Sequence, residues 1–321
     1  MTLISILIAL IIERLDAKGR YWQMHVYASK YLNLSTSDSS IATSITKPLL
    51  KKEIGFLLWL VIPAACIGFI YTLFDFVLFQ LAINVVILLV CIGCIYLREK
   101  YKGYLNAMQR QDNEAATLYA LQLGQKKTAE QLDGETLGQT LAWINFRFYC
   151  AVLFWFVVLG PAGAVFYALV RTYADLVRKD IEVTKQKNED AEELEQVGFE
   201  YSITQYHKVL QSLLFWLDWL PARIASLGYL IIGNFNKGTT CWLKYLLDFK
   251  VSNRKVVTHT ALAAEQVEQK HIGCTFEAKC MVKLVKRNIF LFLVLSNVLS
   301  FFLNLRMLVQ MLLLNDPLLM T

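Results

Sequence analysis

The stretch "WINFRFYCAVLFWFVVLGPAGAVFYALVRTYADLVRKD", residues 143–180, decides the fold because Gly160-Pro161 interrupts a long apolar run bounded by charged residues. Proline inside a helix removes an amide donor and disfavours a straight helix. Arg147 precedes the run and Arg171 follows it, and basic residues collect on the cytoplasmic side of a membrane. A helix that dips into the membrane and returns satisfies both arginines. A kinked helix that crosses the membrane completely is the alternative, and the sequence leaves both open.

Composition places this chain among integral membrane proteins, since 56% of its 321 residues are hydrophobic and 13% are aromatic. We expect an all-α, polytopic helical membrane protein with about four to five membrane segments, each judged against the roughly 20 apolar residues that cross a bilayer. The whole chain, 1–321, is read as a single membrane domain. Its expected membrane segments are residues 2–14, 54–73, 76–97, 150–172 and 288–305.

Three other parts of the chain are assigned by their polarity. Residues 98–148 and 173–208 are expected in the cytoplasm, and residues 209–232 are expected either in the membrane or along its surface. Lysines precede the segment at 54–73 and basic residues follow the segment at 76–97, so both outer ends are expected in the cytoplasm. The short connection between the two segments is then expected outside the cell. A secretory signal is disfavoured because no basic residue precedes the first apolar run and no small-residue cleavage site follows it.

Several familiar chemistries find no support in the sequence. It contains no glycine-rich phosphate loop and no His-Glu-x-x-His motif, and its four histidines are scattered, so we expect no metal and no cofactor. Cys91 and Cys94 form a CxxC pair within an apolar helix, where a thiol behaves as a small hydrophobe. The net charge of +6 reflects lysines beside an anionic leaflet, so no nucleic-acid partner is expected. The absence of a repeated half gives a transporter little support.

Charged residues at membrane depth are the feature that suggests a functional site. Such groups are costly unless they are paired or face a cavity. For each residue alone, snorkelling to the interface or a helical pair between Arg171 and Asp175 accounts for the charge equally well. The whole set, accompanied by tryptophan and tyrosine, favours a shared polar cavity that opens toward the cytoplasm. Its charged members are Glu13, Arg14, Arg147, Arg171, Asp175, Asp218 and Arg223.

Four segments resemble the AmpE family, inner-membrane proteins linked to β-lactamase regulation. They are "IIERLDAKGRYWQ" (11–23), "LAWINFRFYCAVLFW" (141–155), "GPAGAVFYALVRTYADL" (160–176) and "LDWLPARIASLGYLIIG" (217–233). AmpE is in turn similar to the CobD/CbiB family, membrane enzymes of cobalamin synthesis that form an amide. The resemblance implies a multi-pass protein of the bacterial inner membrane.

Departures from the synthase pattern decide which branch we expect. The acidic motifs of the CobD/CbiB synthases are replaced here by Gly124-Gln125-Lys126-Lys127 and by Ala142-Trp143, so the main expectation is a sensor without catalytic residues. Amide formation needs aligned substrates and acid-base help, and a ligase of the CobD/CbiB type remains the alternative. Expected partners are membrane lipids, an anionic cell-wall-related or lipid-linked ligand, and a second copy of the chain. The ligand-binding candidates are Arg147, Arg171, Arg223, Asn145, Trp143 and Tyr167, with Glu13, Arg14, Asp175 and Asp218 as supporting charges.

Overall fold

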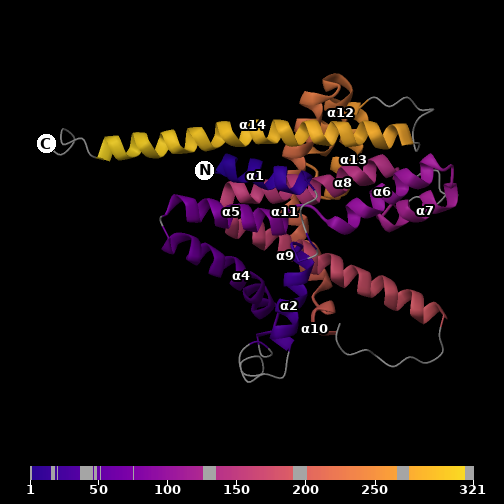
Figure 1. Cartoon of the computed structure of the whole chain (residues 1–321), viewed down its shortest axis with the longest axis horizontal. Helices are drawn as coiled ribbons and strands as arrows, with labels where there is room; N and C mark the ends of the chain where they lie inside the picture. Colours follow the sequence, from indigo (N-terminus) through magenta and orange to yellow (C-terminus); the bar gives the residue numbers. More distant parts are fainter. Residues whose placement is uncertain are drawn as a thin grey trace.

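A computed structural model shows a helical protein in which every regular element of the described residues is a helix (Figure 1). It describes residues 2–15, 19, 21–36, 46, 49–50, 52–74, 76–125, 135–190, 201–265 and 275–314. The helices are α1 (Thr2–Arg14), α2 (Met24–Thr36), α4 (Glu53–Leu73), α5 (Val77–Cys91), α6 (Ile95–Gln109), α7 (Asn113–Gln122), α8 (Leu137–Asn145), the π-helical η2 (Phe146–Cys150), α9 (Ala151–Asp190), α10 (Tyr201–Thr204), α11 (His207–Ile232), α12 (Phe235–Leu246), α13 (Asn253–Glu265) and α14 (Thr275–Leu314). The all-helical expectation is confirmed.

The break expected at Gly160-Pro161 is present and reverses the direction of the chain. Gly160 has φ 67° and ψ −157°, a conformation open almost only to glycine. Arg147 and Asp175, on either side of the break, are hydrogen-bonded to each other. A straight helix would separate them by about 42 Å at 1.5 Å per residue. Residues 146–159 and 161–175 are therefore the two arms of a helical hairpin.

Two stretches are long and apolar enough to cross a membrane, namely Glu53–Leu73 and Leu137–Ile181, among the described residues. A third candidate arises if α5 and α6, bent by 50°, count as one broken span. The expected segments at 2–14 and 288–305 lie in α1 and α14, which are not among these candidates. The part of the chain that the structure describes therefore holds two to three candidate spans, against the four to five segments expected.

The segment expected as one span over residues 76–97 is broken at Gly93. This glycine has φ 71°, and a Cβ there would meet the Glu13 carboxylate and the Tyr149 hydroxyl. Its amide donates to the carbonyl of Phe148 at 3.2 Å, which ties the break to η2. The break lets α1, α5 and η2 approach closely, a contact that hydropathy alone does not predict.

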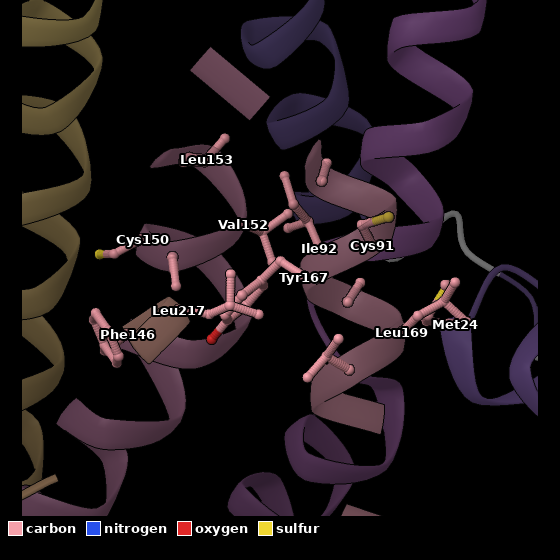
Figure 2. Close-up of a cluster of buried hydrophobic side chains, with 14 of the residues drawn as sticks. Met24, Cys91, Ile92, Phe146, Cys150, Val152, Leu153, Tyr167, Leu169 and Leu217 are labelled. Carbon is pink, nitrogen blue, oxygen red and sulfur yellow. The ribbon is translucent and has the colours of Figure 1, made fainter. Parts of the chain in front are cut away.

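The hairpin lies at the centre of the apolar core. Figure 2 shows side chains from both arms gathered with others from α5, α11 and α2. Tyr167 of the second arm belongs to this cluster together with Val152 of the first arm and Leu217 of α11 (Figure 2). Burying apolar surface stabilises by about 25 cal/mol per Å² in water, whereas within lipid close packing carries more of the stability. The core therefore fixes the position of the buried polar side chains of the hairpin, Arg147, Tyr167 and Arg171.

Helices α11, α12 and α13 form a three-helix unit beside the hairpin. Trp242 of α12 donates to the carbonyl of Arg223 at 3.1 Å, so α12 folds back along α11. The side chain of Asn253, at the start of α13, donates to the carbonyl of Phe215 in the first half of α11 at 2.7 Å. The amide of Asn234, just after α11, donates to the carbonyl of Ala264 near the end of α13. Helix α13 therefore runs in the same direction as α11. Helix α14 packs across this unit (Figure 1).

Candidate functional site

The centre of the candidate site is an ion pair between the two arms of the hairpin. Nη1 of Arg147, in η2, donates to Oδ1 of Asp175 at 2.9 Å and to Oδ2 at 3.2 Å. Arg178 lies one turn after Asp175 and reaches the same carboxylate at 3.5 Å. Arg147 is buried and Asp175 is partly exposed, so the pair lies at the mouth of the hairpin. A charge on one arm thus neutralises a charge on the other.

Arg171 joins three elements through backbone carbonyls. Its Nη1 donates to the carbonyl of Arg147 at 2.8 Å, and its Nη2 donates to that of Cys91 at 3.2 Å. The last carbonyls of a helix lack partners within that helix, and Cys91 ends α5. The guanidinium also lies 4.1 Å from the centre of the Phe148 ring, a cation–π contact. The predicted helical pair between Arg171 and Asp175 is therefore not formed, because Arg171 points toward η2 and α5.

Tyr167 connects the hairpin to α11. Its hydroxyl donates to Oδ1 of Asp218 at 2.7 Å, and both side chains are buried. Asp218 interacts electrostatically with Arg147, Arg171 and Asp175. Two arginines and two aspartates from three chain segments therefore lie near one another, together with a tyrosine, and of these five residues Asp175 alone is partly exposed. The sequence prediction placed all five of these residues in the site, and the structure brings them together.

Arg147 has donor capacity that the protein does not use. Its Nε and Nη2 are buried, and neither has a hydrogen-bond partner. A buried, unpaired donor on a charged group costs more than about 1–3 kcal/mol, so such atoms point to a functional demand. The ring of Trp143 lies 5.8 Å from the Arg147 guanidinium. Asn145 makes only a weak contact, from the Cys150 thiol at 4.0 Å.

The supporting charges near the N-terminus occupy a neighbouring cluster. Glu13 is buried and pairs with Arg98 at the start of α6, and its Oε1 accepts from the Tyr149 hydroxyl at 2.7 Å. Arg14 is exposed. Sequence reasoning used Arg98 only as a marker of orientation and did not single out Tyr149. Gly93 was a signal for this cluster, since a Cβ there would meet the Glu13 carboxylate and the Tyr149 hydroxyl.

Arg223 lies at another part of the fold. Its guanidinium donates to the carbonyls of Trp219, Leu246 and Asp248 and to Oδ1 of Asn253, at 2.7–3.3 Å. It also lies 4.5 Å from the Trp219 ring centre. These partners belong to α11, the turn after α12 and the start of α13. Arg223, expected beside Arg147, instead holds the three-helix unit together, because its donors are taken up by the turn carbonyls and Asn253.

Comparison with known proteins shows the family to which the sequence belongs. The family described as "Regulatory signalling modulator protein AmpE" matches residues 1–306. The chain belongs to the AmpE family. Protein AmpE of Shigella flexneri is 27% identical over 320 residues, covering 94% of this chain and 99% of that protein. The resemblance predicted from four motifs therefore extends over nearly the whole chain, including α1, the hairpin and α11.

The chain is also similar, over a shorter region, to a cobalamin biosynthesis protein. Cobalamin biosynthesis protein CobD of Chromobacterium violaceum is 34% identical over 92 residues, which is 29% of this chain and 23% of that protein. No solved structure matches the chain. Among the described residues, no three His, Cys, Asp or Glu side chains are grouped as metal ligands. Arginine, tyrosine and carboxylate side chains, rather than a metal cluster, make up the candidate site.

Proposed function

We propose that this AmpE-family protein is an inner-membrane sensor that binds an anionic ligand at Arg147 and modulates β-lactamase induction and cell-wall signalling. The observation that carries the proposal is the pair of buried, unpartnered donors on Arg147, Nε and Nη2. A carboxylate or phosphate fits such a donor pair because a guanidinium binds both groups with two parallel hydrogen bonds. Asp175 holds Arg147 from its other side, through Nη1.

The proposed position of the site is the cytoplasmic mouth of a hairpin that enters the membrane without crossing it. Between the ion pair and the turn, the arms comprise residues 148–159 and 161–174, or about 18 and 21 Å of helix. Both lengths fall short of the roughly 30 Å of hydrocarbon. Arg147, Arg171 and Arg178 then lie on one side, as the preference of basic residues for the cytoplasm requires. A ligand bound there would bridge the two arms.

The regulatory mechanism follows from the contacts of the hairpin. An anion at Nε and Nη2 of Arg147 would weaken the attraction between Arg147 and Asp175 and favour the Asp175–Arg178 contact. A ligand shifts an equilibrium only by its differential affinity for the two states. We propose two states. Without ligand, Arg147 and Asp175 form the ion pair, and with ligand bound, this ion pair is weakened. Tyr167 and Asp218 would transmit the change to α11.

The test measures ligand binding and signalling with the same variants. Full-length protein in nanodiscs is mixed with undecaprenyl phosphate or a muramyl peptide, and bound ligand is detected by native mass spectrometry. Arg147→Gln should abolish retention of one of these anions, whereas Arg254→Gln, which removes a guanidinium paired with Glu135 outside the hairpin, should retain it. β-Lactamase induction in a strain lacking the gene, complemented by either variant, should follow the binding result. Equal binding by wild type and Arg147→Gln would overturn the proposal.

The CobD similarity supports a second candidate, a membrane-bound ligase that forms an amide. The shared 92 residues are the observation that favours it. Purified protein incubated with cobyric acid, an aminopropanol or its phosphate, ATP and magnesium should give no amide if the sensor proposal is right. If the wild type forms the amide and Asp218→Asn does not, the sensor proposal is wrong and the protein is a ligase.

A further inference from the structure

Helix α12 divides into three faces of different chemistry. Gly238 and Tyr245, seven positions apart, are buried against the rest of the unit. Phe235 and Leu243 are exposed about 80° apart around the helix, Leu247 just beyond its end is also exposed, and the exposed Asn236 lies within this arc. Residues four or seven positions apart lie on one side of a helix. The helix therefore presents an apolar arc to its surroundings beside its buried face.

The third face of α12 is basic. Lys237 and Lys244 are exposed and seven positions apart, so they lie two turns apart on one side of the helix, with the exposed Thr240 between them and the apolar arc. Lys250 follows the helix and is also exposed, whereas the carboxylate of Asp248 is engaged by the Lys250 amide at 2.8 Å. An exposed apolar arc bordered by lysines is the pattern of a helix lying in the interface of an anionic membrane.

Exposed aromatic residues continue this surface beyond α12. Phe249 lies parallel to Trp219 with ring centres 5.0 Å apart, and Trp216 lies 6.3 Å from the same ring. Trp216 and Phe249 are both more than half exposed. Tryptophan and other amphipathic aromatics gather at the headgroup level of membranes. The apolar arc and the aromatic group are thus joined at the end of α12.

Apolar exposure also extends along α11, against which α12 packs. Its exposed members are Trp216, Leu220, Leu227 and Ile231, which recur at helical spacing and form one stripe. Arg223 fixes α12 to α11 through the carbonyls of Leu246 and Asp248. The two helices therefore present their exposed apolar side chains from a rigid unit, and α12 lies at the edge of the molecule in Figure 1.

We propose that α12 and residues 247–250 form an interfacial anchor that binds an anionic phospholipid surface. Phe235, Leu243, Leu247 and Phe249 enter the headgroup and upper acyl region, and Lys237, Lys244 and Lys250 contact phosphate groups. Charge complementarity selects the occupant, because three exposed lysines border the apolar arc, against one aspartate in the segment. This anchor is separate from the Arg147 site and does not depend on ligand binding there.

The experiment follows amide exchange of α12 in the full-length protein. Hydrogen–deuterium exchange is measured over residues 235–250 in nanodiscs of phosphatidylcholine alone and of phosphatidylcholine with phosphatidylglycerol. Exchange should be slower in the anionic nanodiscs, and Lys237→Gln with Lys244→Gln should remove that difference, since each lysine near an anionic surface contributes about a fivefold preference. The matched control is Lys279→Gln with Lys283→Gln, which removes two lysines of α14 and should leave the difference intact.

Two further measurements distinguish lipid binding from self-association of the chain. Leu243→Gln should speed exchange of α12 in both kinds of nanodisc while the peptides of α13 stay protected, which also shows that the variant is folded. Equal exchange in neutral and anionic nanodiscs would overturn the anchor. Protection that appears only as the protein dimerises, seen as a doubled mass in native mass spectrometry, would also overturn it and assign the surface to a second copy of the chain.

Discussion

Arg147 and Asp175 are 28 positions apart in the sequence, yet Nη1 of one lies 2.9 Å from Oδ1 of the other. This contact exists because the chain reverses at Gly160 between them. The same reversal brings Arg171 to the carbonyl of Arg147 and Tyr167 to Asp218. One glycine conformation and one ion pair therefore define the geometry of the candidate site, and both are accessible to mutation.

Removing one partner of the ion pair should destabilise the protein more than removing both. Arg147→Met leaves the Asp175 carboxylate with the exposed Arg178, and because the pair is only partly buried we expect a loss of about 1–3 kcal/mol. The double variant Arg147→Met with Asp175→Leu replaces both charges by apolar side chains and should recover most of that loss. Denaturant unfolding in detergent measures both of these variants and the single variant Asp175→Leu against the wild type. Additive losses in the double variant would contradict a direct interaction.

Gly160→Ala should lower the free energy of unfolding by about 1–3 kcal/mol, the usual cost of holding a side chain in a glycine-only conformation. A Cβ there would meet no neighbouring atom, so the loss reports backbone conformation alone. Gly68→Ala is the control, because Gly68 lies in α4 without a positive φ and its Cβ would meet only Ala162 at an ordinary 3.4 Å. If Gly160→Ala has the same free energy of unfolding as the wild type, the reversal of the chain does not depend on this residue.

The sequence was informative where local chemistry determines the structure. The proline after Gly160 predicted a break, and charges within apolar runs predicted that Arg147, Arg171, Tyr167, Asp175 and Asp218 belong to one site. The hydrogen-bond partner of each charged side chain was not predictable, because it depends on which chain segments lie next to one another in the fold. Arg171 binds two carbonyls instead of its helical neighbour Asp175, since the break after α5 brings the Cys91 carbonyl within its reach.

Arg223 illustrates the limit of reasoning from composition. In the sequence it resembles Arg147, an arginine beside apolar and aromatic residues, and nothing local separates the two. The difference arises from the turn after α12, whose carbonyls occupy the Arg223 donors, whereas two donors of Arg147 stay without a partner. A short connection that returns beside α11 therefore converts a candidate ligand-binding residue into a structural one.

Arg223→Lys should loosen the three-helix unit without affecting the hairpin. A lysine keeps the charge but cannot reach the same four acceptors, and the lost charged hydrogen bonds amount to about 2 kcal/mol. Hydrogen–deuterium exchange should increase at residues 246–253 and stay unchanged at residues 147–175. Arg254→Gln, which removes contacts to Glu135 and the Gly124 carbonyl, is the control and should leave residues 246–250 protected. Faster exchange around Arg147 in Arg223→Lys would instead place both arginines in one site.

Acidification should destabilise the three-helix unit through His259. Burial lowers the pKa of His259 below its ordinary value of 6.5, and Lys255 lowers it further. The folded protein therefore binds this proton less tightly than the unfolded chain does, and stability is lost as the pH falls through about 6.5. The melting temperature should decline between pH 7.5 and pH 5.5. His259→Gln should make that decline of the melting temperature smaller. The pKa of His25 is also lowered by burial, so replacing His25 as well should reduce the decline further. A wild-type melting temperature that rises over the same interval would contradict the assignment, because a histidine stabilised in its charged form gives the opposite slope.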